Sequence, residues 1–309
     1  MPKPIFDIKK DNPPGGYFGA SIDKHEIYFN VWKPTGEVKA KVLFFHGFGE
    51  HIHRYEHVFT KFAEAGIMVK GMDYRGHGRT VYRNNAVKGF LPGTEQVCDD
   101  MIQLNELPVP GIDETNIPTF LFGHSFGGVL ALTLVQDPAR LAMISNFRGM
   151  VVQAPALLAF QTPGKVTPVF LQKIIDLLGG VLGKIAIPAG VPLDVISSDK
   201  DEQEKYKNDS LNHGSISFRL ARLMMVRLPK SVPAKSATVN CPILVYHSVC
   251  DRLTDSSVSK AFVEAVASTD KKWHGFTKED GLQHELHNEP RISGSIITDY
   301  IKWILERAQ

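Results

Sequence analysis

Cysteine is scarce in this chain of 309 residues, which contains only Cys98, Cys241 and Cys250. An odd and sparse set of cysteines is typical of a reducing compartment and predicts no disulfide framework. The sequence also lacks an uncharged apolar run of the ~18–20 residues that a membrane-spanning helix needs. No apolar core near the N-terminus indicates a secretory signal. We therefore expect a cytoplasmic protein whose contact with membranes is at most peripheral.

Neither sign of charge dominates the sequence. Lys and Arg number 35 and Asp and Glu 33, which gives a formal net charge of +2. This balance gives no reason to expect a nucleic-acid partner or a polybasic membrane anchor. A chain of this length fits one large α/β domain with an insertion, or two small domains.

Apolar runs of β type alternate with helical patterns along most of the chain. The expected strands are an early, antiparallel one at 26–32 and continuous apolar runs at 42–45, 68–72, 120–122, 150–152 and 243–246. The expected helices cover 55–65, the stretch after 125, 257–267 and 292–307. Continuous apolarity indicates strands that are buried on both faces, as in a parallel sheet covered by helices. The alternation predicts a doubly wound α/β fold with a mostly parallel central sheet and helices on both faces.

This alternation breaks between about residues 155 and 239. Apolar segments at 169–178 and 181–187 are followed there by a polar segment at 197–206. We interpret 155–239 as an inserted helical cap (lid) over the C-terminal ends of the strands, and 1–154 and 240–309 as the core. The alternative is a second helical domain unrelated to the site. The apolar segment either lines a ligand tunnel and dips into a lipid surface, or packs on the core.

Ser125 lies between two glycines in the sequence Gly123-His-Ser-Phe-Gly127, directly after an apolar strand and before a buried helix. This G-x-S-x-G pattern in a strand–turn–helix context is that of a nucleophile elbow, which holds a serine hydroxyl at the apex of a sharp turn. The alternative is a glycine-rich turn whose serine only caps the helix.

A serine nucleophile needs a base and an orienting acid, which follow it in the order acid, then histidine, in such folds. Asp251 lies a few residues past the strand at 243–246 and is the preferred acid, with Asp255 as the alternative. His284 precedes the C-terminal helix and is the preferred base. The alternatives are His287, His274, expected within a strand, and His247, which precedes the acid loop.

Two backbone N–H groups are needed to stabilise the oxyanion of such a reaction. The residue after the nucleophile, Phe126, is one candidate donor, and Phe48 in the loop His46-Gly-Phe-Gly-Glu50 is the other. The alternative for that loop is an ordinary glycine turn. His53 and His57 lie one helical turn apart, but no H-E-x-x-H pattern is present, so we expect no metal site and no organic cofactor.

Several motifs together resemble the monoacylglycerol lipase family of α/β-hydrolases. They follow the family's order over nearly the whole chain: His46-Gly-Phe-Gly-Glu-His-Ile-His-Arg-Tyr55, Asp73-Tyr-Arg-Gly-His-Gly78, Gly123–Gly128, Asp251-Arg-Leu-Thr-Asp255 and His284-Glu-Leu-His-Asn-Glu289. The resemblance implies an α/β-hydrolase fold and a Ser125, Asp251 and His284 triad, with the N–H groups of Phe48 and Phe126 as the oxyanion hole. It further implies a polar pocket for a glycerol head group at Glu50, Arg54 and His287, with Tyr206 a weaker match. Glu50 and Arg54 are alternatively a structural ion pair that stabilises the oxyanion loop.

The resemblance implies a serine hydrolase that cleaves monoacylglycerol to a fatty acid and glycerol. We expect a monoacylglycerol or related lipid ester as its partner, and association with a membrane or lipid-droplet surface. A lysophospholipase or broad carboxylesterase would keep the triad and differ in head-group selection. A peptidase of this fold and a non-catalytic ligand receptor are further alternatives. Cys250, beside the expected acid, is either a thiol-sensitive position or a passive small residue.

Overall fold

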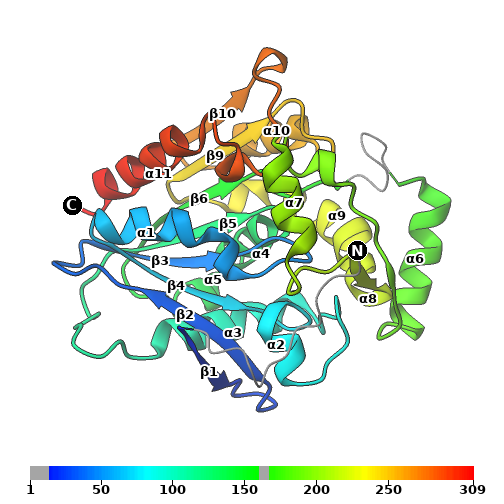
Figure 1. Cartoon of the computed structure of the whole chain (residues 1–309), viewed down its shortest axis with the longest axis horizontal. Helices are drawn as coiled ribbons and strands as arrows, with labels where there is room; N and C mark the ends of the chain where they lie inside the picture. Colours follow the sequence, from blue (N-terminus) through cyan, green and yellow to red (C-terminus); the bar gives the residue numbers. More distant parts are fainter. Residues whose placement is uncertain (1–13, 160–166) are drawn as a thin grey trace.

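The computed structural model describes residues 14–159 and 167–309, and within these ranges an eight-stranded sheet lies at the centre of the molecule (Figure 1). Its strand order is β1-β2-β4-β3-β5-β6-β9-β10. The strands are β1 (Gly16–Gly19), β2 (Glu26–Trp32), β3 (Ala40–Phe45), β4 (Ile67–Asp73), β5 (Thr119–His124), β6 (Phe147–Gln153), β9 (Ile243–Ser248) and β10 (Lys271–Phe276). The strand β2 pairs antiparallel with β1 and β4, and all neighbours from β4 to β10 pair in parallel. The predicted mostly parallel sheet is therefore confirmed, including the antiparallel strand at 26–32.

Helices cover both faces of this sheet. One face packs against α1 (Glu56–Glu64) and α11 (Ser293–Arg307), which lie side by side in Figure 1. The opposite face packs against α3 (Thr94–Glu106), α4 (Phe126–Val135) and α10 (Ser256–Ala265). Short helices α2 (Gly78–Arg83) and α5 (Pro138–Leu141) and 3₁₀ turns at Ile52–Tyr55, Ser236–Thr238, Lys278–Asp280 and Leu286–Asn288 complete the connections.

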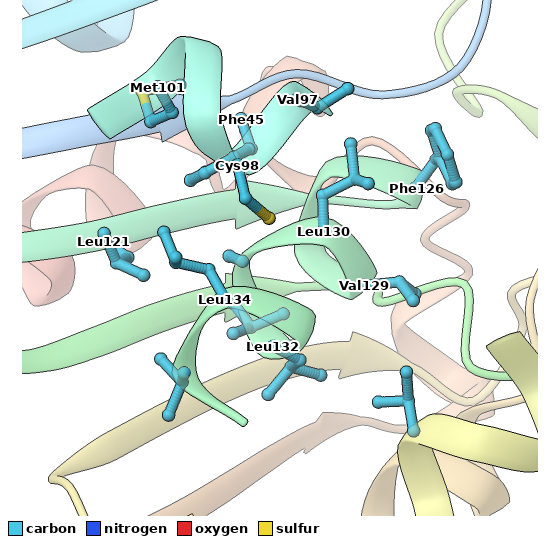
Figure 2. Close-up of a cluster of buried hydrophobic side chains, with 14 of the residues drawn as sticks. Phe45, Val97, Cys98, Met101, Leu121, Phe126, Val129, Leu130, Leu132 and Leu134 are labelled. Carbon is cyan, nitrogen blue, oxygen red and sulfur yellow. The ribbon is translucent and has the colours of Figure 1, made fainter. Parts of the chain in front are cut away.

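The helix α4 is apolar on all sides because it is enclosed by other elements. Figure 2 shows Leu130 and Leu134 of α4 close to Leu121 of β5 and Cys98 of α3. A helix that is hydrophobic all round is a buried one. Its first turn is therefore fixed firmly against the sheet, directly after Ser125.

The segment between β6 and β9 is mostly helical. It contains α6 (Val169–Val181), α7 (Lys200–Asn208), α8 (Phe218–Arg222), a π-helical turn at Leu223–Arg227, α9 (Leu228–Ala234), a 3₁₀ turn at Leu193–Val195 and the strand pair β7 (Ala186–Pro188) and β8 (Ser215–Ser217). The helix α6 packs against α8 and lies at the periphery of the molecule (Figure 1). Residues 160–166 of the expected cap and 1–13 of the expected core lie outside the described residues.

The predicted helices at 55–65, 257–267 and 292–307 agree with α1, α10 and α11 within two residues. The second apolar segment of the insertion, 181–187, is not a helix: it ends α6 and leads into β7. The helix α3 was not expected, because polar residues such as Asp99, Asp100 and Gln103 interrupt its apolar face.

Candidate active site

The predicted site residues follow the carboxyl ends of parallel strands, which meet at one edge of the sheet. Phe48 follows β3, Ser125 follows β5, Asp251 follows β9 and His284 lies after β10. Open α/β sheets bind their ligands at this edge. The topology thus brings together residues as distant in the sequence as Phe48 and His284, which are 236 positions apart.

Ser125 has a strained backbone, with φ 54° and ψ −120°. A non-glycine residue in a sparsely populated conformation of this kind costs about 1–3 kcal/mol and is typical of functional sites. The neighbouring glycines make the turn possible. A Cβ at Gly127 would lie 2.1 Å from the carbonyl oxygen of Phe45, and one at Gly123 would lie 2.6 Å from that of Gly127.

Asp251 and His284 form a short hydrogen bond of 2.6 Å between Oδ2 and Nδ1. The carboxylate also accepts hydrogen bonds from the backbone N–H groups of Leu253 (2.7 Å) and Thr254 (3.0 Å) and from the Thr254 hydroxyl (2.8 Å). Burial favours the protonated acid, but the charges and hydrogen bonds of His284 and His247 outweigh it and hold the pKa of Asp251 far below its usual range. Asp251 is therefore an ionised, fixed acceptor.

The same pair shifts the histidine in the opposite direction. Burial of His284 opposes its charged form, yet the Asp251 carboxylate outweighs burial and raises the pKa of His284 above its ordinary value. Because Nδ1 is held by Asp251, Nε2 is the nitrogen that remains for proton transfer. His284 and Ser125 line the same cavity.

The alternative acid and bases have other partners. Asp255 caps α10, where its carboxylate accepts a hydrogen bond from the Ser257 N–H at 2.9 Å. His287 stacks on Tyr55, with ring centroids 4.4 Å apart, and contacts the Gln153 amide. His274 lies in β10 and stacks on Tyr246.

His247 is a second histidine on the Asp251 carboxylate, which sequence reasoning considered only as a base. Its Nε2 lies 3.0 Å from Asp251 Oδ2, and its Nδ1 lies 2.8 Å from the Ser259 hydroxyl. The side chain is fully buried. Its spacing of four residues before the acid, at the end of a buried strand, is the signal that would have indicated this contact.

The two candidate oxyanion donors lie at the required places in the chain. Phe126 begins α4, and the N–H groups of a first helical turn have no partner within their helix. Phe48 lies in the loop after β3 and lines the cavity. That loop is fixed through Gly47, whose N–H donates to Glu50 Oε1 at 2.5 Å, and Gly49 has a left-handed φ of 75°.

A cavity of about 490 Å³ opens above Ser125. Its walls are mainly apolar and come in large part from the segment between β6 and β9, including Leu171, Ile174, Ile175, Leu178, Met224 and Met225. The first four of these belong to α6. The cavity thus has a floor at the carboxyl ends of the strands, where Ser125 and His284 lie, and a mainly apolar roof from the segment between β6 and β9.

The polar part of the cavity wall contains Glu50, Tyr206 and Glu285. Two other residues of the expected head-group pocket, Arg54 and His287, do not line this cavity but a neighbouring polar pocket, which Tyr206 also lines. Arg54 forms an ion pair with Glu50 and a bidentate one with Glu285, at 2.6 and 2.7 Å. The expected ion pair is therefore present, and Glu50 at the same time lines the cavity.

Glu285 was missed by sequence reasoning, which considered only the histidines on either side of it. Its partner Arg54 lies 231 positions away, so only the fold brings the two together. The acidic residue directly after the candidate base was the available signal.

The histidines considered for a metal site have protein partners. His53 lies 2.7 Å from the Tyr28 hydroxyl, and the His57 ring donates to the His287 carbonyl oxygen at 2.9 Å. Over residues 14–159 and 167–309, no cluster of three or more His, Cys, Asp or Glu side chains is arranged to hold a metal ion. In the same ranges no helix has the length and apolarity to cross a membrane.

The chain is similar to known hydrolases over most of its length. The family model described as Hydrolase_4, serine aminopeptidase, S33, matches residues 36–291. A monoacylglycerol lipase from Mycolicibacterium smegmatis is 30% identical over 93% of this chain and 95% of its own. An abhydrolase domain-containing protein from Dictyostelium discoideum is 34% identical over 93% of this chain, which spans only 28% of that protein's length. A solved structure of a soluble variant of monoglyceride lipase from Saccharomyces cerevisiae, in complex with a substrate analog, has a TM-score of 0.81 and 22% identity and covers 100% of this chain and 99% of its own.

The fold and the elbow at Ser125 define an α/β-hydrolase, as the sequence predicted. The chain belongs to the Hydrolase_4 family. The resemblance to monoacylglycerol lipases and the assignment as a carboxylic ester hydrolase are confirmed at the level of this family.

Proposed function

We propose that this protein hydrolyses monoacylglycerols to a fatty acid and glycerol. The observation that carries the proposal is the cavity of about 490 Å³ at Ser125, in which a mainly apolar wall meets a small polar region. Burying an acyl chain contributes about 0.8 kcal/mol per methylene without selecting a head group, so the few polar side chains must do so. The names of relatives such as the Mycolicibacterium enzyme support the same substrate class.

In the proposed mechanism, the Ser125 hydroxyl attacks the ester carbonyl carbon while His284 Nε2 takes its proton. Asp251 fixes the imidazole tautomer and stabilises the imidazolium that forms. The N–H groups of Phe48 and Phe126 stabilise the negative charge on the carbonyl oxygen. His284 then gives the proton to the departing glycerol oxygen, and water activated by the same histidine hydrolyses the acyl-enzyme.

We also propose that residues 155–239 act as a cap and that α6 contacts a lipid surface. On its outer side Val169, Phe170, Leu177 and Val181 are between 65% and 74% exposed. Other residues of the same helix, Leu171, Ile174, Ile175 and Leu178, line the cavity. A helix with apolar residues both at the surface and at the cavity suits a position between a lipid surface and an acyl-binding cavity.

Three alternatives keep part of this arrangement. A lysophospholipase or broad carboxylesterase uses the same residues with another head group, and a peptidase is consistent with the family description. A non-catalytic receptor would bind the lipid without turnover.

The test is fatty-acid release from monoacylglycerol, diacylglycerol and lysophospholipid, with wild type and Ser125→Ala in parallel. We expect release mainly from monoacylglycerol, with a loss of about 10⁶-fold in the variant. Serine-dependent release from all three substrates would support a broad lipid esterase instead. Absence of serine-dependent release from any of them would contradict the proposal and direct attention to a peptidase or a receptor.

A further inference from the structure

The polar part of the cavity wall carries acidic side chains but no Lys or Arg side chain among the described residues. The acidic side chains are those of Glu50 and Glu285. The cation that pairs with both carboxylates, Arg54, lies behind them in the neighbouring pocket. A ligand in the cavity therefore meets two carboxylates and not the guanidinium.

Arg54 is held in that position by contacts on several sides. Both of its terminal nitrogens donate to Glu285, one of them also donates to Glu50, and its Cζ lies 4.7 Å from the centre of the Tyr206 ring. Burial works against its charge, but the two carboxylates outweigh burial and raise the pKa of Arg54 well above its usual value. The guanidinium is therefore held in place by protein partners.

Glu285 keeps some capacity to accept hydrogen bonds, whereas Glu50 has none to spare. Glu285 accepts from both terminal nitrogens of Arg54 and from the Asn288 amide at 2.8 Å. Glu50 has four partners: Arg54, the Gly47 N–H, the Tyr55 hydroxyl at 2.7 Å and His124 Nδ1 at 3.4 Å. Two carboxylate oxygens offer about four acceptor positions, so Glu285 has room for a ligand hydroxyl. Arg54 and His124 hold the pKa of Glu50 well below its usual range although burial opposes this, so Glu50 is ionised.

We propose that Glu285 determines the head-group specificity of this site: with Glu50 it presents a net negative charge to the ligand, which excludes phosphate-bearing head groups and admits uncharged polyols. This inference rests on the proposed function and narrows it. Among the described residues that line the cavity, a phosphate would find no Lys or Arg and two carboxylates. A glycerol head group instead donates a hydroxyl hydrogen to the free acceptor position of Glu285.

The experiment compares kcat/KM for a 1-acylglycerol and the corresponding 1-acylglycerol 3-phosphate, both with a chain short enough to remain monomeric. Because like charges placed together across an interface weaken binding by about a hundredfold or more, we expect wild type to prefer the uncharged ester by at least about 100-fold. Glu285→Gln keeps the size of the side chain and removes its charge, which also frees part of Arg54. We expect it to lower this preference at least about tenfold.

Two further variants separate charge from structure. Glu285→Asp keeps the charge and retains the preference. Glu289→Gln removes another buried carboxylate, which accepts from Ser198 and Gln283 and does not line the cavity, and it leaves the ratio of the two rates unchanged. The ratio is the readout because a merely structural loss lowers both rates alike.

The possible results distinguish a failure of this inference from a failure of the proposed function on which it rests. Hydrolysis of both esters at similar rates by wild type overturns the inference even if no variant folds, and so does a ratio that Glu285→Gln does not change. If wild type shows no Ser125-dependent hydrolysis of either ester, the proposed function fails and the inference fails with it.

Discussion

The floor and the roof of the cavity are built in opposite ways. On the floor, Asp251 and His284 are buried and bonded to each other at 2.6 Å, and Asp251 accepts further hydrogen bonds from Leu253 and Thr254. The roof comes from the segment between β6 and β9, which lines the cavity mainly with apolar side chains and includes α6, a helix with exposed apolar residues. Directional contacts fix atoms to within fractions of an ångström, whereas apolar contacts tolerate ligands of different length. The comparison teaches that the directional and the apolar contacts around this cavity come from separate parts of the chain.

The largest expected effect comes from removing the carboxylate charge of Asp251 on the floor of the cavity. Asp251→Asn keeps the shape but no longer stabilises the His284 imidazolium or its tautomer, so we expect kcat to fall by about 10⁴-fold. In wild type, activity should be lost as the pH falls through the raised pKa of His284, that is, with a midpoint above its ordinary value of 6.5. Steady-state kinetics across pH checks both expectations.

Asp255→Asn is the matched control for this variant. Asparagine is as good a helix cap as aspartate, so α10 should keep its N-terminus and the activity should stay within about twofold. A collapse of activity in Asp255→Asn with activity retained in Asp251→Asn would reverse the assignment of the acid.

An intermediate effect, on stability, is expected where the core contacts the inserted segment. The rings of His77 in the core and His213 in the inserted segment have centroids 5.0 Å apart. Burial lowers the pKa of His77 to about 4 and that of His213 to about 3, against 6.5 for an exposed histidine. The unfolded chain therefore binds more protons below pH 6.5, and stability falls as the pH falls from 6.5 towards 4. Each histidine lowers the free energy of unfolding by about 2 kcal/mol at pH 5.

Denaturant unfolding between pH 5 and 7 measures this loss, and His213→Gln provides the comparison. His213 Nε2 donates to the Gly76 carbonyl oxygen at 2.9 Å and Nδ1 faces the Ser215 N–H, so the neutral ring fits this place. The variant loses one titrating group, and its stability should change less steeply with pH than that of wild type. Equal slopes for the two proteins would show that His213 does not contribute.

The smallest effect on the folded protein is expected on the outer side of the roof. Phe170→Ser with Leu177→Ser replaces two exposed side chains of α6, so the free energy of unfolding should change by no more than about 0.5 kcal/mol per site. Binding to phosphatidylcholine vesicles should weaken about tenfold or more, because each side chain loses its apolar burial in the lipid. Vesicle sedimentation and hydrolysis of a short soluble ester measure the two properties separately.

Ile22→Ser is the control for surface hydrophobicity in general. Ile22 lies outside the cap and is 65% exposed, the same fraction as Phe170. It should leave vesicle binding unchanged. Equal losses in both proteins, or none in the α6 variant, would argue against α6 as the lipid contact.

The sequence indicated which residues lie on the floor of the cavity more completely than it indicated those of the polar wall, for a physical reason. Ser125, Asp251 and His284 each follow a strand closely, so local pattern and the geometry of a parallel sheet were enough to propose them. Glu285 is paired with Arg54, which lies 231 residues away, and a contact of that separation leaves no local pattern.

The fold shows the same division between local and long-range information. The strands buried on both faces were evident as continuous apolar runs, as in β3 and β5. The helix α3 escaped detection because its buried side includes the charged Asp100, which Arg75 neutralises from another part of the chain at 2.8 Å. A buried charge with a distant partner looks like a surface residue in the sequence.

The strained turn at Ser125 also affects the thermal stability of the protein. Glycine adopts a positive φ at little cost, so the same turn with glycine at position 125 would release part of the roughly 1–3 kcal/mol stored there. Such a chain would be more resistant to heat and, under the proposed mechanism, chemically inert. The native sequence therefore retains, at the proposed nucleophile, a residue that lowers its thermal stability, and selection for greater thermostability alone would tend to remove it.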